Sequence, residues 1–311
     1  MMKKRKNSLL PMYQLPATAT KRLRLSKRAT IIVGIAIFFC TTIAINYLYV
    51  YRPNLATTDY SIHDPMPDPP HPTMTNLIMV PGHAIYTGAM NEADLHQDAG
   101  WILEEFQKGG QINTFIDHIK KGIEQLQEDN KALLIMSGGE TRPKAGPLSE
   151  AQSYWEIAQH YLSNSKDLIE RVATEEHARD SFENLLFSIC RFYELTGNYP
   201  ESITIVGFEF KKERFIKVHR AAARYPLDRF QYIGIDPANA NINISKGESE
   251  NSLGPFEHDI YGCHGGLWQK KLNRNPYRRQ HAYRQTCPAL APLIGYCPVD
   301  KAQIFTGTLP W

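Results

Sequence analysis

The chain has 311 residues, of which 42% are hydrophobic and 22% are charged, and its formal net charge is +3. This composition is typical of a globular protein, and the length suits one medium domain with additional segments or two small domains. The five cysteines lack the dense spacing of a disulfide scaffold. The absence of a Walker loop, a Ser-His-Asp order, a zinc-type cysteine pair and a GxGxxG motif argues against several common enzyme classes, including the standard dinucleotide dehydrogenases.

An uncharged stretch over residues 30–50, TIIVGIAIFFCTTIAINYLYV, predicts a membrane-spanning helix. At about 1.5 Å per residue, a helix of this length covers the roughly 30 Å hydrocarbon core of a bilayer. Many basic residues precede the stretch, whereas Arg52 alone follows it within the next twenty positions. This asymmetry predicts a cytosolic N-terminus and a lumenal or extracytoplasmic C-terminal part. A cleaved signal peptide is the alternative, but the apolar region is long for one and no convincing small-residue cleavage site follows it.

We expect five segments along the chain. They are a basic tail (1–29), the transmembrane helix (30–50), a proline-rich linker (51–75), an α/β domain (76–236) and a C-terminal extension (237–311) that packs on the domain.

Strand and helix patterns alternate through the α/β domain. Short apolar runs predict strands at 77–80, 132–136, 169–174, 203–206 and 230–235. Apolar residues at helical spacing predict helices at 93–107, 111–127, from Ser149 onward, at 180–195 and at 211–225. Such alternation is typical of a three-layer, doubly wound, mostly parallel sheet of about five strands, a Rossmann-like α/β fold.

In such a sheet, ligands bind beyond the carboxyl ends of the strands. The predicted strand ends carry Gly82-His83, Ser137-Gly138-Gly139-Glu140, Glu175-Glu176 and Gly207-Phe208-Glu209. The second of these leads through a loop to a helix capped by Ser149, an arrangement that aims free backbone N–H groups at a ligand. The plainer explanation is that loops are polar in any case.

Several spaced motifs resemble the YdcF-like family, a domain of unknown function that includes SanA-like and ElyC-like proteins. The family's SGG motif falls on Ser137, Gly138 and Gly139, and its SEA motif falls on Ser149, Glu150 and Ala151. Its acid falls on Glu175, and its Thr-x-Glu-Asn motif falls on Ser181, Glu183 and Asn184. The resemblance covers about residues 77–235.

Three positions depart from the family pattern. The glycine-rich first turn is reduced to Pro81-Gly82-His83, His118 stands where the family has an arginine, and Lys211 stands in place of the signature histidine, although Arg214 matches the signature arginine. The resemblance implies a nucleotide-like cofactor or an envelope-lipid substrate, but it assigns no single reaction.

Two residues are candidates for moving protons. His83 is a candidate acid/base group, with a polar turn residue as the alternative. Glu175 is a candidate general base, although two adjacent acids at a strand end are more often solvated.

Other residues are candidates for holding a ligand. Gly82 and the SGG turn allow close approach of the backbone. Glu150 lies in the first turn of its helix, where the dipole alone also favours an acid, and Glu183 forms a pattern like a capping box with Asp180. Asn184 has no comparable structural explanation and is the stronger candidate.

Lys211 and Arg214 begin a predicted helix, where the dipole disfavours cations. Either a bound anion or a neighbouring acid, Glu209 or Glu213, must offset their charge. We interpret both cations as ligand-binding residues.

The C-terminal extension shows no clear periodicity and is rich in basic residues, which suit either a solvated face or contact with phosphate groups. An oxidising compartment permits a Cys287–Cys297 disulfide. A metal site from Cys263, His264 and His258 has no recognised spacing, so no metal is expected. Asn243 begins a glycosylation sequon.

The sequence thus predicts a single-pass membrane protein whose strand-end cleft binds a small anionic ligand, nucleotide-like, phosphorylated or lipid-linked. It leaves open whether the protein is an enzyme, and it specifies no cofactor. The alternative is a non-catalytic, membrane-tethered interaction module with a decayed cleft, which the reduced first turn and the lost histidine favour. Nucleic acid is not an expected partner on the lumenal side.

Overall fold

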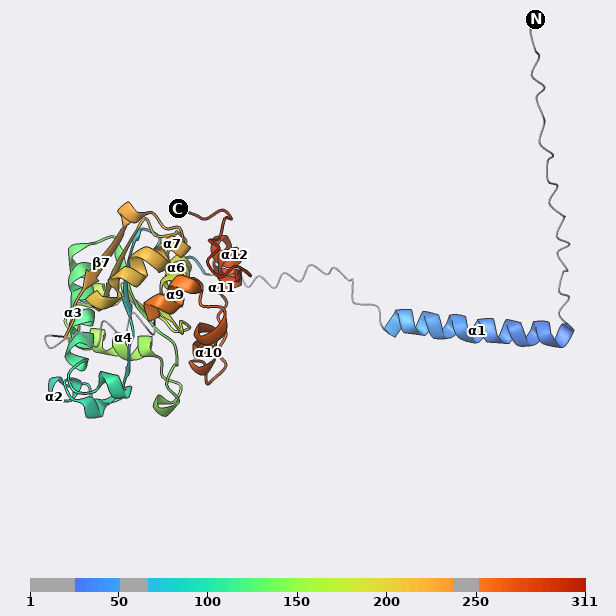
Figure 1. Cartoon of the computed structure of the whole chain (residues 1–311), viewed down its shortest axis with the longest axis horizontal. Coiled ribbons are helices and arrows are strands. Elements are labelled where there is room, and N and C mark those ends of the chain that lie inside the picture. The colour runs from blue at the N-terminus through green and yellow to red at the C-terminus, as the bar shows by residue number, and fades with distance from the viewer. Residues whose placement is uncertain (1–25, 51–66, 238–251) are drawn as a thin grey trace, which may run out of the picture. The chain divides into compact units, whose positions relative to one another are not determined.

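The computed structural model describes residues 26–50, 67–237 and 252–311 (Figure 1). The chain divides into two compact units, Met1–Pro65 and Met66–Trp311. In the first unit, helix α1 spans Lys27–Val50 and is long and apolar enough to cross a membrane. Its apolar side chains are exposed, with Ile32 and Phe38 each at 66%. Three features of the sequence analysis lie outside the described part of the chain: Arg52, most of the linker and Asn243.

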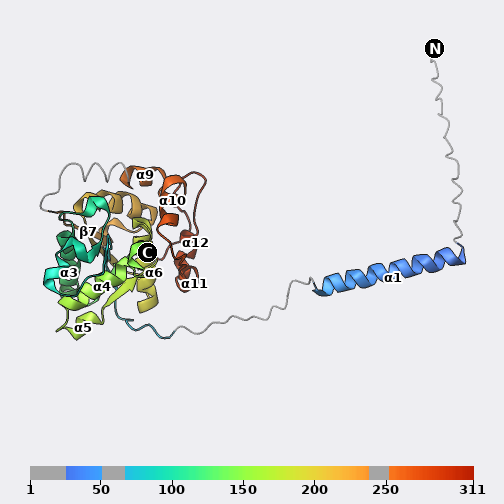
Figure 2. The ribbon, with the colours of Figure 1, turned by 90° about the horizontal axis from the view of Figure 1, so that it is seen from below.

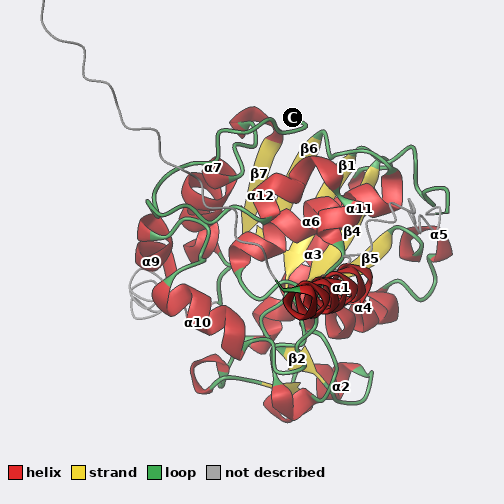
Figure 3. Cartoon of the chain, turned by 90° about the vertical axis from the view of Figure 1, so that its right-hand side faces the viewer, coloured by secondary structure: helices red, strands yellow, loops and turns green. Residues whose placement is uncertain are grey.

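The second unit is built on a five-stranded parallel sheet in the order β5-β4-β1-β6-β7 (Figure 3). The strands are β1 (Asn76–Pro81), β4 (Ala132–Ser137), β5 (Val172–Glu175), β6 (Ser202–Gly207) and β7 (Phe230–Gly234). All six residues of β4 are buried, as expected for a parallel strand covered on both faces. From β1 the chain adds β4 and β5 on one side of the sheet and then β6 and β7 on the other. The boundary between β1 and β6 is therefore the topological switch point of a doubly wound fold. The predicted fold class is confirmed.

Helices cover both faces of the sheet (Figure 1). On one face, α3 (Ile112–Glu128) and α4 (Glu150–Tyr161) pack over Ile78, Val80 and Leu134. On the other face lie α6 (Ser181–Thr196) and a helical segment made of η4 (Glu209–Lys211), the π-helix η5 (Arg214–His219) and α7 (Arg220–Ala222). Short connecting turns complete this part: η3 (Pro143–Ala145), α5 (Lys166–Ile169) and η6 (Leu227–Arg229).

The helix predicted over residues 93–107 is wrong. This stretch forms α2 (Glu92–Leu95), η1 (Asp98–Gly100), β3 (Trp101–Ile102) and η2 (Glu105–Gln107), and β3 pairs with β2 (Ile85–Tyr86). The strand pair buries Trp101 against Tyr86, with their ring centroids 5.1 Å apart. Burial of the aromatic ring therefore outweighs the local helical pattern.

The C-terminal extension contains helices that its sequence did not predict. Among the described residues these are α9 (Gly254–His258), α10 (Gly265–Asn273), α11 (Tyr283–Thr286), η8 (Pro288–Leu290) and α12 (Ala291–Ile294). Figure 2 shows α11 and α12 next to α6, with α9 and α10 further along the domain. Leu267, Tyr283 and Leu290 join the hydrophobic core that α6 forms with the sheet. The extension therefore belongs to the same compact unit as the sheet.

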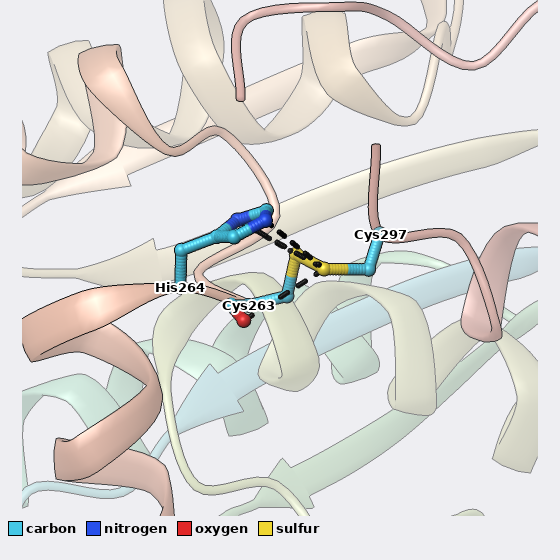
Figure 4. Close-up of side chains that lie close together, drawn as sticks. All are labelled: Cys263, His264 and Cys297. Carbon is cyan, nitrogen blue, oxygen red and sulfur yellow. Dashed lines mark hydrogen bonds between the residues drawn. A yellow bond between two sulfur atoms is a disulfide. The ribbon is translucent and has the colours of Figure 1, made fainter. Parts of the chain in front are cut away.

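Two disulfides hold the extension, and neither is the Cys287–Cys297 pair expected from the sequence. Cys190 of α6 is bonded to Cys287, and Cys263 is bonded to Cys297 (Figure 4). The sequence pairing is wrong because cysteine spacing carries no information on which residues meet across the helices. Cys263, which was weighed as a metal ligand, is bonded in a disulfide, so its sulfur is not a thiolate, and Nδ1 of His258 lies 2.8 Å from the Gly254 carbonyl oxygen.

Candidate functional site

A cavity of about 630 Å³ opens at the carboxyl edge of the sheet. Gly82 and His83, which follow β1, and Phe208, which follows β6, line it, so it lies at the switch point between these strands. The first residues of α6 and residues of η4, η5 and α10 complete the lining.

The predicted site residues fall into two groups. Those that line the cavity are Gly82, His83, Glu150, Asn184, Lys211 and Arg214. Those that lie behind its lining are Ser137, Gly138, Gly139, Glu175 and Glu183, all of them buried.

His83 is held rigidly at the cavity. Its backbone carbonyl accepts a hydrogen bond from Gln107 Nε2 at 2.7 Å, and its ring stacks on Phe208 with centroids 4.8 Å apart. Its Nδ1 lies 3.3 Å from the ammonium of Lys211, which donates, so Nε2 carries the hydrogen. Nε2 finds no hydrogen-bond partner among the described residues. Burial, and then the charge of Lys211, hold the pKa of His83 well below its usual value, so a neutral imidazole offers an N–H to the cavity.

The cavity lining is strongly cationic. Its basic residues are Arg142, Arg179, Lys211, Arg214, Lys270 and Arg274, against the two acids Glu150 and Asp180. The neighbouring acids form other ion pairs, in which Glu209 bonds Lys212 at 3.2 Å and Glu213 bonds Lys217 at 2.6 Å. Two of the lining cations are paired with acids outside the lining, Arg142 with Glu104 and Arg179 with Glu183, so the lining itself holds more basic than acidic side chains.

The glycine turn after β4 serves the packing of α4. A Cβ on Gly138 would lie 2.7 Å from Glu150 Oε2, and a Cβ on Gly139 would lie 2.9 Å from the Ala178 carbonyl. The carbonyls of Gly139 and Gly138 accept the N–H groups of Glu150 and Ala151 at 3.1 and 3.0 Å. The expectation that this turn and helix present free N–H groups to a ligand is therefore wrong, because the turn itself uses them.

Glu150 occupies the space above the glycine turn. It is 8% exposed, and its carboxylate accepts a short hydrogen bond from Thr141 Oγ1. A Cβ on Gly82 would lie 2.5 Å from the Glu150 Cβ, which explains the glycine that follows β1.

Asn184 is anchored from behind the cavity lining. Its Nδ2 donates to the Ser137 carbonyl at 3.1 Å and to Ser137 Oγ at 2.9 Å, and Ser137 Oγ in turn donates to Glu175 Oε2 at 2.7 Å. Burial raises the pKa of Glu175 to about 7, although hydrogen bonds from Ser137 and the His177 N–H oppose the rise. Glu175 therefore lies two hydrogen bonds behind Asn184 and is fully buried.

Glu183 belongs to a buried network of charges. It accepts from Arg179 Nη2 at 2.6 Å, and Lys271 Nζ lies 3.4 Å from it and 3.0 Å from Asp180 Oδ2. Burial alone would raise the pKa of Glu183, but Lys271 and Arg179 outweigh it and lower the pKa. Asp180 also caps α6 by accepting the Glu183 N–H at 2.8 Å, as the capping-box pattern predicted.

Sequence reasoning missed the contributions of the extension and of the loop before α6. Arg179 was not singled out, and Lys270 and Arg274 were seen only as part of a basic run. Their spacing of four residues on α10 is a signal that places both near one face of a helix. The extension was expected to pack on the domain, but the sequence does not identify which of its residues reach the cavity.

Comparisons with known proteins identify one relative and no known activity. No family model matches the chain, and no solved structure matches it significantly. The protein named "Uncharacterized protein YOR238W" from Saccharomyces cerevisiae is 34% identical over 263 residues, which cover 67% of this chain and 86% of the yeast protein. The chain therefore belongs to the family of this yeast protein.

Proposed function

We propose that the switch-point cavity binds a small anionic molecule. The observation that carries this proposal is the lining of six cations against two acids in a cavity of about 630 Å³. Clefts lined by one sign of charge focus the field and concentrate oppositely charged ligands. A volume of this size fits a small ligand.

The walls favour a ligand that carries an apolar or aromatic part beside its negative charge. Phe208 and Phe210 stack with centroids 4.6 Å apart, and Lys211 Nζ lies 5.0 and 5.9 Å from their ring centres. Nucleotide-like, phosphorylated and lipid-linked molecules all combine these two features. The ammonium of Lys211 would pair with the anionic group of the ligand, and the rings of Phe208 and Phe210 would cover its apolar part.

As an enzyme, the protein would use His83 at the ligand. A neutral imidazole that is fixed by Lys211 and Phe208 donates a hydrogen bond from Nε2, which suits the stabilisation of developing negative charge. Glu175 is buried, so we propose that it acts by positioning Ser137 and Asn184. The five-stranded order and the placement of the SGG turn beside Asn184 support the proposal that the domain is YdcF-like.

We also propose that α1 anchors the protein in a membrane with the C-terminal domain on the lumenal or extracytoplasmic side. The two disulfides in that domain support this side, because they persist in oxidising compartments. Alkylation of the protein in intact cells tests the proposal by mass spectrometry. Reduced Cys190 and Cys287 in freshly quenched cells would contradict it.

Thermal-shift titration of the full chain in detergent tests ligand binding. Nucleotides, sugar phosphates, S-adenosylmethionine and inorganic phosphate are the probes. A Lys211→Ala, Arg214→Ala variant is expected to lose the shift, whereas Lys212→Ala, which removes a neighbouring charge outside the cavity, is expected to keep it. Equal shifts in both variants would remove the two cations from the site. If no probe gives a shift, the interaction-module alternative becomes the better interpretation.

A further inference from the structure

A serine and a histidine meet at the cavity in an arrangement that the sequence does not reveal. Ser181 is the first residue of α6 and lines the cavity. Its Oγ lies 2.7 Å from Nε2 of His219, which comes from η5, 38 residues further along the chain. A hydroxyl at a cavity within hydrogen-bond reach of an imidazole is the geometry of an activated nucleophile.

The surroundings of His219 keep its ring fixed and neutral. The ring is fully buried, with the centroids of Phe256 and Phe215 at 4.7 and 5.3 Å. Burial, and then the charges of Arg214 and Lys271, hold the pKa of His219 well below its usual value. A base at this position needs the neutral tautomer with its hydrogen on Nδ1, in which Nε2, the nitrogen that faces Ser181, accepts the hydroxyl proton. Nδ1 has no hydrogen-bond partner among the described residues, so aromatic packing orients the ring in place of a carboxylate.

The same place favours negative charge that develops on a substrate. Ser181 stands at the N-terminus of a 16-residue helix, whose dipole is positive at this end, although Asp180 already accepts the Glu183 N–H there. Arg214 also lines the cavity, and its charge acts on His219 from nearby. These groups would stabilise an oxyanion formed at Ser181, and that negative charge would also offset the cost of a transient imidazolium.

An apolar wall lies next to this pair. Phe215 and Phe256, which contact the His219 ring, also line the cavity, and Leu267 lines it too. The cavity therefore joins a cationic region to an apolar surface beside Ser181. A molecule with an acyl group and a negative charge matches both features.

We propose that Ser181 and His219 form a nucleophile–base pair that hydrolyses a carboxylic ester bearing an anionic group. Ser181 Oγ would bond to the carbonyl carbon while its proton passes to His219 Nε2. The bond from carbon to the alcohol oxygen would then break, and the leaving alcohol would take that proton. Water would attack the acyl-serine, give a proton to His219 and release the acid, and the proton would return to Ser181.

This inference rests on the proposed function for the place where the substrate binds, but its test needs no anionic ligand. The full chain in detergent is treated with a small dialkyl fluorophosphate, which forms a bond from phosphorus to a reactive serine oxygen and releases fluoride. Peptide mass spectrometry is expected to find the label on Ser181. Ser181→Ala is expected to abolish it, whereas Ser188→Ala, two turns further along α6, is expected to leave it unchanged.

The role of His219 has its own readout. His219→Gln is expected to slow labelling by about 100-fold or more, the usual contribution of a general base. Added imidazole is expected to restore labelling of His219→Ala, which a purely structural histidine would not show. Absence of label on Ser181 in the folded wild-type chain, or an unchanged rate in His219→Gln, would overturn the pair. If Ser181 is not labelled but anionic probes still shift the melting temperature, the anionic-ligand proposal stands. If Ser181 is labelled but no anionic probe shifts the melting temperature, only the anionic-ligand proposal is refuted.

Discussion

Glu175→Gln is expected to change how the stability of the protein depends on pH. The Glu175 side chain is fully buried between Ser137, the His177 N–H and the hydroxyl of Tyr283, which lies 3.4 Å from Oε1. Burial raises its pKa to about 7 from a usual value of 4.5. Because the pKa of Glu175 is raised in the folded protein, the contribution of this carboxyl to folding stability is fully present below about pH 4.5 and is lost as the pH rises through about 7.

The two pKa values set the size of this effect. Between pH 5 and pH 8 the unfolded chain releases the Glu175 proton before the folded protein does, which costs about 2.5 kcal/mol of folding free energy. Glutamine has nearly the shape of the protonated acid and does not titrate. The free energy of unfolding of Glu175→Gln, relative to wild type, is therefore expected to rise by about 2.5 kcal/mol over this range.

Urea unfolding of the full chain in detergent, followed by tryptophan fluorescence at several pH values, measures this difference. Glu176→Gln, at the half-buried neighbouring position, is the matched control for removing one carboxylate from the same strand end. A difference between Glu175→Gln and wild type that stays constant from pH 5 to pH 8 would refute the reasoning.

Two further predictions concern the packing around the site. Lys271→Met keeps the length of a side chain that is 5% exposed but leaves Asp180 and Glu183 without its charge, so urea unfolding is expected to show a loss of about 3 to 5 kcal/mol. An unchanged midpoint would show that Arg179 alone neutralises these acids. Gly139→Ala places a Cβ 2.9 Å from the Ala178 carbonyl and is expected to cost about 1 to 3 kcal/mol, whereas Gly266→Ala, which meets nothing within 4 Å, is expected to cost less than about 0.5 kcal/mol. Equal losses in the two glycine variants would contradict the close packing at Gly139.

The fold could be predicted from the sequence because its strands are short apolar runs with helical patterns between them. The run over 132–136 is an example, since it is too short for a helix and becomes a fully buried strand. The order of the strands could not be predicted, because pairing depends on contacts between distant segments. The stretch over 93–107 shows the other limit: its local pattern favours a helix, and the burial of Trp101 with Tyr86 decides against it.

The grouping of candidate residues was predictable where chain order and sheet geometry place them together. His83 follows a strand, and Asn184 and Arg214 stand near helix starts, so the carboxyl edge of the sheet brings all three to one cavity. The contact of Ser181 with His219 and the two disulfide pairings were not predictable, because they depend on how helices pack across one another.

The C-terminal extension is a structural component of this site. Lys271 from α10 compensates the charge of Glu183, and Tyr283 from α11 covers the carboxyl of Glu175. The Cys190–Cys287 disulfide fixes the extension to α6, the helix that carries Asn184. An α/β domain that ended near residue 236 would leave Asp180 and Glu183 without Lys271 and would expose the apolar face of α6 to water. The covalent bond to α6 therefore maintains the charge balance behind the cavity, and conditions that reduce it are expected to loosen the site as well as the fold.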